Sequence, residues 1–423
     1  MTATPVRLSA AQLDAADPLA GFRSRFFIPP HGDAECIYLC GNSLGLQPRT
    51  AERFLLEELK EWRRLAVEAH FRGRRPWRDY HEQFAVPLAG LTGGRPDEVV
   101  CMNGLTANLH LMMVSFYRPT PERYRILIEQ PAFPSDRYAV VSQLRFHGLD
   151  PASALIEVAP RAGEWHLREE DIEGAIHEAG DSLALVLLPG VQYLSGQVLD
   201  MGRITAWVRG AGAVAGWDLA HAIGNVPLAL HDWGADFAIW CSYKYLNGGP
   251  GAVAGAFVHS RHGRKPSLPR FAGWWGHNKF TRFQMRPDFV PIPGAEGWQV
   301  SNPPVLGMAA LLASLEIFEA AGMIRLREKS LALTGYLAER LAAELEGRVA
   351  ICTPLDPAAR GCQLSLRLTA GAKRARAVFE RLGAAGVMCD WREPDVVRVA
   401  PVPLYNSYSD LDRFVRILAG AVS

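Results

Sequence analysis

Two short segments hold residue types that could do chemistry together. In the segment 217–221, Asp218 directly follows an apolar run, and in the segment 242–251, Lys244 lies between an apolar strand-like run and a glycine-rich stretch. A lysine amine forms a Schiff base with an aldehyde, and a carboxylate keeps a pyridine nitrogen protonated so that the ring accepts electrons. A pocket that holds both groups is what the cofactor pyridoxal phosphate (PLP) needs. The alternative is a surface lysine and a helix-capping aspartate; it is the usual one for an isolated lysine, but the apolar flanks argue against it here.

Strand-like runs in the middle of the chain would position these two side chains. Short, nearly continuous apolar runs alternate there with helical patterns, at 125–129, 183–188, 211–216 and 235–240. This alternation predicts an α/β fold with a mostly parallel sheet that is covered on both faces. Ligands of such sheets gather at the carboxyl ends of the strands, and Asp218 falls at such an end.

The pattern changes after Pro304. The sequence then predicts a long helical stretch from 311 to 345, a strand at 362–368, a helix at 377–382, a strand at 396–399 and a last helix opened by the capping segment 409–412. These elements indicate a small α+β domain that the long helix joins to the rest. We therefore expect an N-terminal segment with a large PLP-binding domain over residues 1–304, and a small C-terminal domain over residues 305–423.

Length and charge exclude several classes of protein. The 423 residues include 45 Lys and Arg against 44 Asp and Glu, so nothing indicates nucleic acid or an anionic membrane surface as a partner. The basic run 72–75 is short and is typical of a solvated loop or a small-anion contact. The first residues contain no apolar signal core and no stretch reaches transmembrane length, so we expect a cytoplasmic protein without a membrane segment.

The seven cysteines are scattered, odd in number and without a Cys-x-x-Cys pair. This pattern favours reduced thiols over a disulfide framework or a zinc site, and we expect no bound metal. Cys241 precedes Lys244 closely enough to suggest a nucleophile. Its apolar neighbours at 237–240 favour a buried strand thiol instead.

A phosphate group would need donors, and the segment 104–108 could supply them. It follows an apolar segment and precedes the helical run 109–117. A helix N-terminus at this place would offer free backbone N–H groups and a favourable dipole to a dianion. Thr106 would add its hydroxyl and Leu105 its backbone. The alternative is that Thr106 is a plain N-cap, which gives the same turn without a ligand.

The chain resembles the kynureninases, PLP enzymes of the aspartate-aminotransferase-like fold, almost from end to end. Besides the segments around Asp218 and Lys244, the resemblance rests on 38–48, 70–71, 75–77, 133–136, 273–277, 301–304 and 398–407. An Asp and a Lys alone would also fit aminotransferases and cysteine desulfurases, whereas the whole combination is more specific. The resemblance implies this fold and a bound PLP.

The resemblance also implies roles for the cofactor-binding residues. Lys244 would bind the cofactor covalently and remove the substrate Cα proton, and Asp218 would hold the pyridinium with His221 beside it. Phe133 would stack on the ring, and Asp136 would lie near its polar edge. The remaining cofactor contacts would come from Leu105, Thr106, Tyr243, Trp274 and Asn302. Tyr243 would also act in the later proton transfers.

Two of these residues, Trp274 and Asn302, would come from a partner subunit, so we expect a homodimer with shared active sites. The substrate ketone would be surrounded by Ser43, His70 and Asn302, with His277 as a further candidate. Arg398 would hold the α-carboxylate, because its planar fork suits a bidentate carboxylate. A surface salt bridge is the alternative for Arg398, but the flanking valines weaken it.

One position departs from the family. Some kynureninases carry a serine in the segment 187–191, where this chain has Pro189. Proline has neither a hydroxyl nor an N–H, so a polar contact at this place would be lost. This puts one peripheral contact in doubt and leaves the chemistry intact.

The activity that the resemblance implies is hydrolytic Cβ–Cγ cleavage of L-kynurenine, 3-hydroxy-L-kynurenine or both, in tryptophan catabolism. The products would be anthranilate or 3-hydroxyanthranilate, together with L-alanine. The sequence does not decide between the two substrates. Another PLP enzyme, such as an aminotransferase or a desulfurase, and a non-catalytic binding protein of the same fold remain as alternatives. The intact lysine argues against the last.

Overall fold

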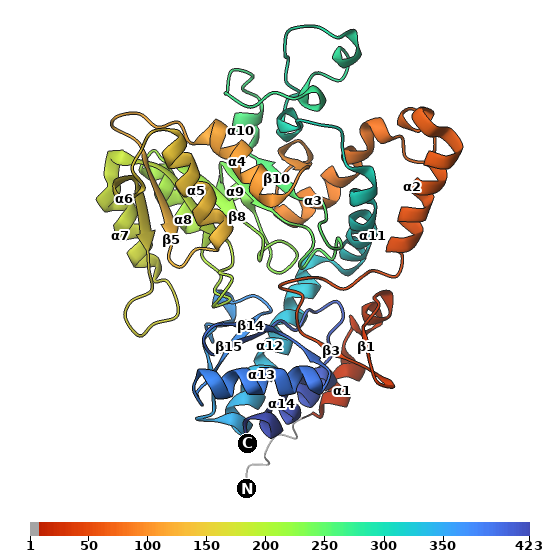
Figure 1. The fold of residues 1–423 in the computed structure, drawn as a ribbon, viewed down its shortest axis with the longest axis vertical. Coiled ribbons are helices and arrows are strands. Elements are labelled where there is room, and N and C mark those ends of the chain that lie inside the picture. Colours follow the sequence, from red (N-terminus) through yellow and green to blue (C-terminus); the bar gives the residue numbers. More distant parts are fainter. Residues whose placement is uncertain (1–7) are drawn as a thin grey trace.

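The computed structural model describes residues 8–423, and its largest element is a seven-stranded sheet (Figure 1). The strand order is β4-β10-β9-β8-β7-β5-β6. From β9 to β6 all neighbours pair parallel, and β10 runs antiparallel to β9 and β4. The predicted α/β fold with a mostly parallel sheet is therefore confirmed. The bounds are β4 Val99–Cys101, β5 Arg125–Glu129, β6 Leu155–Val158, β7 Leu183–Pro189, β8 Val214–Asp218, β9 Phe237–Trp240 and β10 Gly255–Val258.

Helices cover both faces of this sheet, which is why its strands are apolar nearly throughout. One face packs against α4 (Leu105–Phe116) and α5 (Pro134–Phe146). The other packs against α3 (Ala85–Thr92), α7 (Glu169–Ala179) and α8 (Met201–Gly210). The side chains of β7 from Leu183 to Leu188 are all buried between the two layers. Further helices of this lobe are α2 (Ala51–Leu65), α6 (Pro151–Ala154), α9 (Leu230–Trp233) and α10 (Ser260–Gly263).

A second, smaller lobe lies below the first in Figure 1 and has its own core. Its antiparallel sheet has the order β11-β12-β15-β14. The strands are β11 Val349–Ile351, β12 Leu364–Leu368, β14 Asp390–Arg392 and β15 Val396–Val399. They pack with α12 (Met323–Leu345), α13 (Ala372–Ala384) and α14 (Tyr408–Val422). The predicted small α+β unit is therefore present.

The prediction of a single continuous helix after Pro304 is wrong. It consists of α11 (Val305–Ala321) and α12, which meet at a bend of 82°. Gly322 lies at the break with φ 76°, a conformation that glycine adopts without steric cost. The buried leucines of α11 and Leu326 at the start of α12 belong to the core of the large lobe, whereas the buried leucines of α12 from Leu333 onward belong to the core of the small lobe.

The cap predicted for the last helix also differs. The N-cap of α14 is Ser407 rather than Ser409. The Ser407 hydroxyl accepts the N–H of Asp410 at 3.1 Å, and the Asp410 carboxylate accepts the N–H of Ser407 at 3.2 Å. This reciprocal capping box satisfies two donors at once, which a cap two residues later would not do.

The N-terminal segment docks on the small lobe rather than on the large sheet. β3 (Ile37–Tyr38) pairs parallel with β13 (Val387–Met388), and α1 (Ala10–Ala16) packs against α14. The Asp14 carboxylate accepts the N–H of Tyr408 at 2.7 Å. In Figure 1 the red first elements accordingly lie beside the blue last ones. The division at 304/305 stays a prediction, since contacts cross it here and along α11.

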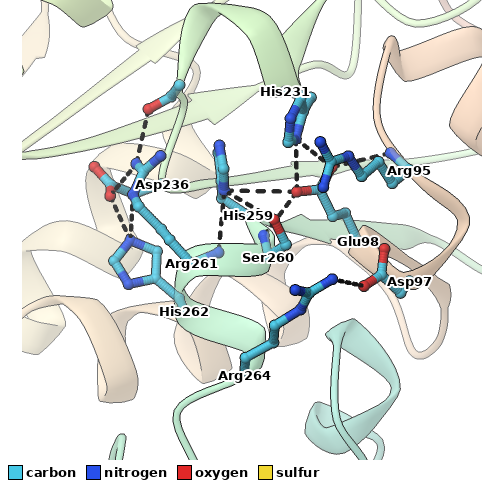
Figure 2. A network of polar contacts seen from close by, with 11 residues as sticks. Arg95, Asp97, Glu98, His231, Asp236, His259, Ser260, Arg261, His262 and Arg264 are labelled. Atoms are coloured by element: carbon cyan, nitrogen blue, oxygen red, sulfur yellow. Dashed lines mark hydrogen bonds and ion pairs between the residues drawn. The ribbon is translucent and has the colours of Figure 1, made fainter.

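A buried polar network holds the β4–β10 edge of the large sheet (Figure 2). Glu98 accepts the N–H of Ser260 at 2.7 Å and that of Arg95 at 2.9 Å, and it contacts Nδ1 of His231 at 2.8 Å. His259 lies beside them, but its Nδ1 accepts the N–H of Arg261. Because these acceptors are already in use, we read the group as a fold-supporting clamp rather than a cation site.

Among residues 8–423, no single helix has the length and apolar character to cross a membrane, and only α11 and α12 taken together, across their bend, meet that criterion. All seven cysteines are free, and Cys241 is buried after β9 as the apolar flanks predicted.

Candidate active site

A cleft of about 510 Å³ opens at the carboxyl ends of β5, β7 and β8. The strands run parallel, so their ends meet at one edge of the sheet, as expected for a ligand site of this fold. The cleft lining contains Leu105, Thr106, Glu129, Phe133, Ser135, Asp136, Pro189, Val191, Tyr193, Asp218, Ala220, His221, Tyr243 and Lys244.

Asp218 and Lys244, which the sequence predicts to share one pocket, both line this cleft. Asp218 ends β8, is 7% exposed and accepts the N–H of Ala220 at 2.7 Å. Lys244 follows β9, and its Nζ lies 3.0 Å from Nε2 of His221 and 5.6 Å from the ring centroid of Phe133. The backbone after Lys244 turns at once, because Asn247 N–H bonds to the Lys244 carbonyl at 2.9 Å. An amine and a carboxylate are thus presented to one space.

His221 is buried between these groups. Burial and the charge of Lys244 hold the pKa of His221 well below its usual value, so the ring is neutral. A neutral imidazole has one acceptor and one donor nitrogen. With Nε2 facing the Lys244 ammonium as the acceptor, Nδ1 carries the hydrogen, and it has no hydrogen-bond partner among residues 8–423. The cleft therefore contains a buried donor that a ligand could satisfy.

Two further acids share the cleft with Asp218. Asp136, in the first turn of α5, has a pKa raised well above its usual value by burial and by the nearby Asp218 carboxylate. Glu129, the last residue of β5, has its pKa raised in the same way. Sequence reasoning missed Glu129. The available signal was an acidic residue at the carboxyl end of a predicted parallel strand.

The N-terminus of α4 opens into the same cleft through Leu105 and Thr106. Gly104 is the N-cap, and no side chain of the described residues caps this helix. The alternative reading of Thr106 as a plain N-cap is therefore wrong. The first N–H groups of α4 and its dipole remain available to an anion.

Aromatic and apolar side chains complete the walls. Phe133 is the N-cap of α5. Its ring and that of Tyr193 pack edge to face, with their centroids 5.3 Å apart. Pro189 pairs with Asp218 across β7 and β8, so the departure from the family pattern lies directly beside the acid. Tyr243 keeps its proton at neutral pH, because burial raises its pKa. Tyr193 is a second cleft residue that sequence reasoning missed.

Five of the predicted site residues are not part of this lining as residues 8–423 form it: Ser43, His70, Trp274, Asn302 and Arg398. Ser43 and Asn302 are exposed. The rings of His70 and Trp77 pack in a T-shaped arrangement, with their centroids 5.6 Å apart. Trp274 is 43% exposed and donates to the carbonyl of Arg282. His277, the further candidate, has both ring nitrogens engaged, with Thr281 and with the N–H of Val290.

Arg398 lies behind the cleft wall rather than on the surface. It is 1% exposed on β15, and burial lowers its pKa to about 10. One Nη donates to the carbonyl of Tyr193 at 2.5 Å, and the other contacts the carboxylate of Asp390. The alternative of a surface salt bridge therefore does not describe this residue, since its ion pair is buried.

The cleft has the groups that PLP requires. A lysine for the aldehyde, an acid for the ring nitrogen, an aromatic ring for stacking and an uncapped helix N-terminus for the phosphate converge on it. The unpartnered Nδ1 of His221 is the independent observation that a polar ligand belongs there. The residues present therefore fit the cofactor.

Comparison with known proteins agrees with this geometry. A family model described as the kynureninase C-terminal domain matches residues 326–418. The chain is 58% identical over 409 residues to the kynureninase of Stenotrophomonas maltophilia (strain K279a), covering 97% of this chain and 96% of that protein. It is 56% identical over 408 residues to that of Koribacter versatilis (strain Ellin345), covering 96% of each.

Solved structures resemble the fold at lower identity. The Escherichia coli cysteine desulfurase CsdA superimposes with a TM-score of 0.74 at 16% identity, over 98% of both chains. The cystine C-S lyase C-DES superimposes with a TM-score of 0.74 at 17% identity, over 92% of this chain and 98% of that one. These likenesses concern the fold alone, whereas the high identity over nearly the whole length is with kynureninases. The chain belongs to the kynureninase family.

Proposed function

We propose that this protein uses PLP to hydrolyse the Cβ–Cγ bond of L-kynurenine, of 3-hydroxy-L-kynurenine or of both. One water is consumed, and anthranilate or its 3-hydroxy derivative is released together with L-alanine, a step of tryptophan catabolism. The observation that carries the proposal is the convergence of Lys244, His221 and Asp218 in one cleft at the strand ends of a chain of this family.

Several residues of the cleft would hold the cofactor. Lys244 would bind its aldehyde, Asp218 would pair with its ring nitrogen and Phe133 would stack on the ring. Asp136 and His221 would bond to its polar groups, and the N-terminus of α4 with Thr106 would hold the phosphate. When bound, PLP supplies a conjugated ring that accepts the electron pair left at the substrate's α-carbon.

Proton transfers are the work of Lys244 and Tyr243. The Lys244 amine would take the Cα proton of the bound amino acid. Tyr243 is protonated at neutral pH and adjacent in sequence, so it can donate and recover a proton while water adds to the γ-carbonyl and the Cβ–Cγ bond breaks. Asp218 contributes electrostatically, since its charge favours the protonated ring nitrogen.

The substrate side rests on residues outside the cleft lining. Arg398 holds the α-carboxylate from the small lobe, and Ser43, His70 and Asn302 surround the aryl ketone. Its donors make Arg398 suited to a carboxylate that carries a full charge.

A homodimer completes the site in this proposal. The segment after α10 extends away from the sheet at the top of Figure 1 and carries exposed apolar side chains, among them Phe280 at 92% and Phe271 at 60%. Large exposed apolar groups of this kind mark interaction surfaces. Trp274, which lies in this segment, and Asn302, which follows it, would then reach the cofactor of the partner subunit.

The test of the activity is anthranilate fluorescence from purified protein supplied with PLP and L-kynurenine, with 3-hydroxy-L-kynurenine in parallel. Release from either substrate supports the proposal, and the ratio of the two kcat/KM values identifies the preferred one. Lys244→Ala should abolish release, and Lys373→Ala, at an exposed lysine of the small lobe, should not. Turnover retained in Lys244→Ala, or no release by the parent protein with either substrate, would contradict the proposal.

The shared site has its own test. Lys244→Ala and Trp274→Ala subunits, each defective alone, are mixed under conditions that exchange subunits. Because a symmetric dimer would combine an intact Lys244 with an intact Trp274 in one of its two sites, activity should return. Mixtures that stay inactive while exchanging subunits would show that Trp274 acts within its own chain.

A further inference from the structure

Two arginines share one carboxylate at the edge of the small sheet. The register of β14 and β15 sets Asp390 directly opposite Arg398. Arg392 is two residues further along β14, so its side chain projects from the same face as that of Asp390. Asp390 Oδ2 contacts Nη2 of Arg392 at 3.1 Å and also contacts a terminal nitrogen of Arg398. One negative charge therefore faces two positive charges.

The same two arginines have donors left over. Nε of Arg398 and Nε of Arg392 are both buried without a hydrogen-bond partner among residues 8–423. An unpaired buried donor is destabilising, and more so when the group is charged. Two such donors in neighbouring guanidinium groups, with one net positive charge between them, are the features of a receptor for a small anion.

The pair lies close to the cleft. Arg398 bonds to the carbonyl of Tyr193, and the guanidinium carbon of Arg392 lies 5.9 Å from the centre of the Tyr193 ring. Tyr193 lines the cleft together with Phe133. Both arginines also help to lower the pKa of His221, after burial and Lys244, so both charges act on the interior of the cleft.

We propose that Arg392 is a second carboxylate-binding residue of the active site, and that Asp390 is a positioning residue that holds Arg392 and Arg398 for one substrate α-carboxylate. The inference rests on the proposed function, since it concerns the same substrate. It adds a second guanidinium to the single arginine expected from the sequence. Asp390 neutralises one positive charge, and the substrate carboxylate neutralises the other.

Two amines that differ only in the carboxylate test the proposal without turnover. L-Alanine and ethylamine are titrated separately into the PLP-loaded, full-length protein, and binding is followed by the change in visible absorbance of the cofactor. Arg392→Gln should weaken L-alanine binding about tenfold or more, which corresponds to about 1.4 kcal/mol. Ethylamine binding should change far less, because ethylamine has no carboxylate to lose. In turnover, the KM for L-kynurenine should rise more than kcat falls.

Two further variants make the result specific. Arg367→Gln removes an exposed arginine that pairs with Asp395 at 3.0 Å in the same sheet, and it should change neither titration. Arg392→Lys keeps the charge but loses the Nε–H, so its L-alanine affinity should lie between those of the parent and Arg392→Gln. If Arg392→Gln does not fold or load PLP, the lysine variant carries the test by the same comparison of the two amines.

The variant Arg398→Gln and the turnover assay separate a failure of the role of Arg392 from a failure of the proposed function. If this variant weakens L-alanine and Arg392→Gln does not, the role of Arg392 is overturned while the proposed function stands. Equal weakening of L-alanine and ethylamine in Arg392→Gln would also overturn it, since a carboxylate-binding residue acts on the carboxylate alone. A parent protein that binds both amines but releases no anthranilate would instead contradict the proposed function.

Discussion

Nζ of Lys244 lies 3.0 Å from Nε2 of His221, and the imidazole is neutral because burial and the lysine charge lower its pKa. The amine is thus oriented by an uncharged acceptor. Among residues 8–423, Lys244 forms no ion pair, although three acids line the same cleft. A lysine held by a neutral partner is easier to release to an aldehyde than one held in a buried ion pair, whose separation is costly.

The electrostatic role of Asp218 gives the first prediction. Asp218→Asn removes the charge that favours a protonated ring nitrogen, so kcat should fall about 10²–10³-fold, the usual size of such a loss. The measurement is kcat per bound PLP, which separates this effect from lost cofactor. Asp181→Asn, at a fully exposed side chain, is the control. A near-normal kcat in Asp218→Asn would remove the pyridinium role.

Pro189 offers a gain-of-binding prediction. It pairs with Asp218 and lines the cleft, where a serine could donate a hydrogen bond. Pro189→Ser should tighten PLP binding about 2–10-fold, since one net hydrogen bond contributes about 0.5–1.5 kcal/mol. The dissociation constant is measured by fluorescence titration of the cofactor-free protein. Pro189→Ala lacks the hydroxyl and should show no gain; an equal gain in both variants would point to the backbone instead.

Glu129 should lower the stability of the folded protein at pH 8. Burial and the Asp218 charge raise its pKa in the folded protein, so the folded state binds this proton more tightly than the unfolded state, whose value is about 4.3. Folding stability is therefore lost as pH rises from about 4.3 towards the folded pKa. Glu129→Gln should melt at a higher temperature than the parent at pH 8, and the gain should vanish near pH 4. A lower melting temperature at pH 8 would show that the charged form is stabilised.

Glu98 should behave in the opposite way. Hydrogen bonds from Ser260, Arg95 and His231 outweigh burial and hold its pKa below the usual value. Its contribution is present above the unfolded pKa and is lost as pH falls through the folded pKa. Glu98→Gln should lower the free energy of unfolding by about 1–3 kcal/mol at pH 7, because the amide cannot accept all the bonds shown in Figure 2.

The free energies of unfolding of the parent and of Glu98→Gln are measured by denaturant titration at pH 7 and at pH 3.5. The difference in free energy of unfolding between parent and variant should narrow at the lower pH, because the Glu98 carboxylate of the unfolded parent binds a proton below about pH 4.3. The exposed Glu316→Gln should match the parent at both values. An unchanged difference at pH 3.5 would mean that packing rather than charge is responsible.

Local sequence patterns predicted the strands well, because their signal is the burial of consecutive residues. The run 125–129 coincides with β5, and Asp218 ends β8 as expected. The break at Gly322 was missed because leucines continue at helical spacing on both sides of it, and periodicity does not report a change of direction. The docking of β3 on β13 joins residues far apart in sequence, for which no local pattern exists.

The candidate site divides in the same way. Sequence patterns locate the ends of strands and the starts of helices. Asp218 and Lys244 lie at or just after strand ends, and the phosphate site lies at the start of α4. Glu129 and the pairing of Asp390 with Arg398 depend on which strands are neighbours and in what register. Those facts emerge only once the two sheets are assembled.

The docked N-terminal segment has a mechanical consequence. The chain passes between the lobes twice, once between β3 and α2 and once at Gly322, where α11 turns into α12. Two covalent tethers at separate points leave a single easy rotation, about the line that joins them, and they resist twisting of one lobe against the other. Any closing of the small lobe over the cleft would therefore follow one arc, and Arg392 and Arg398 would travel along it together.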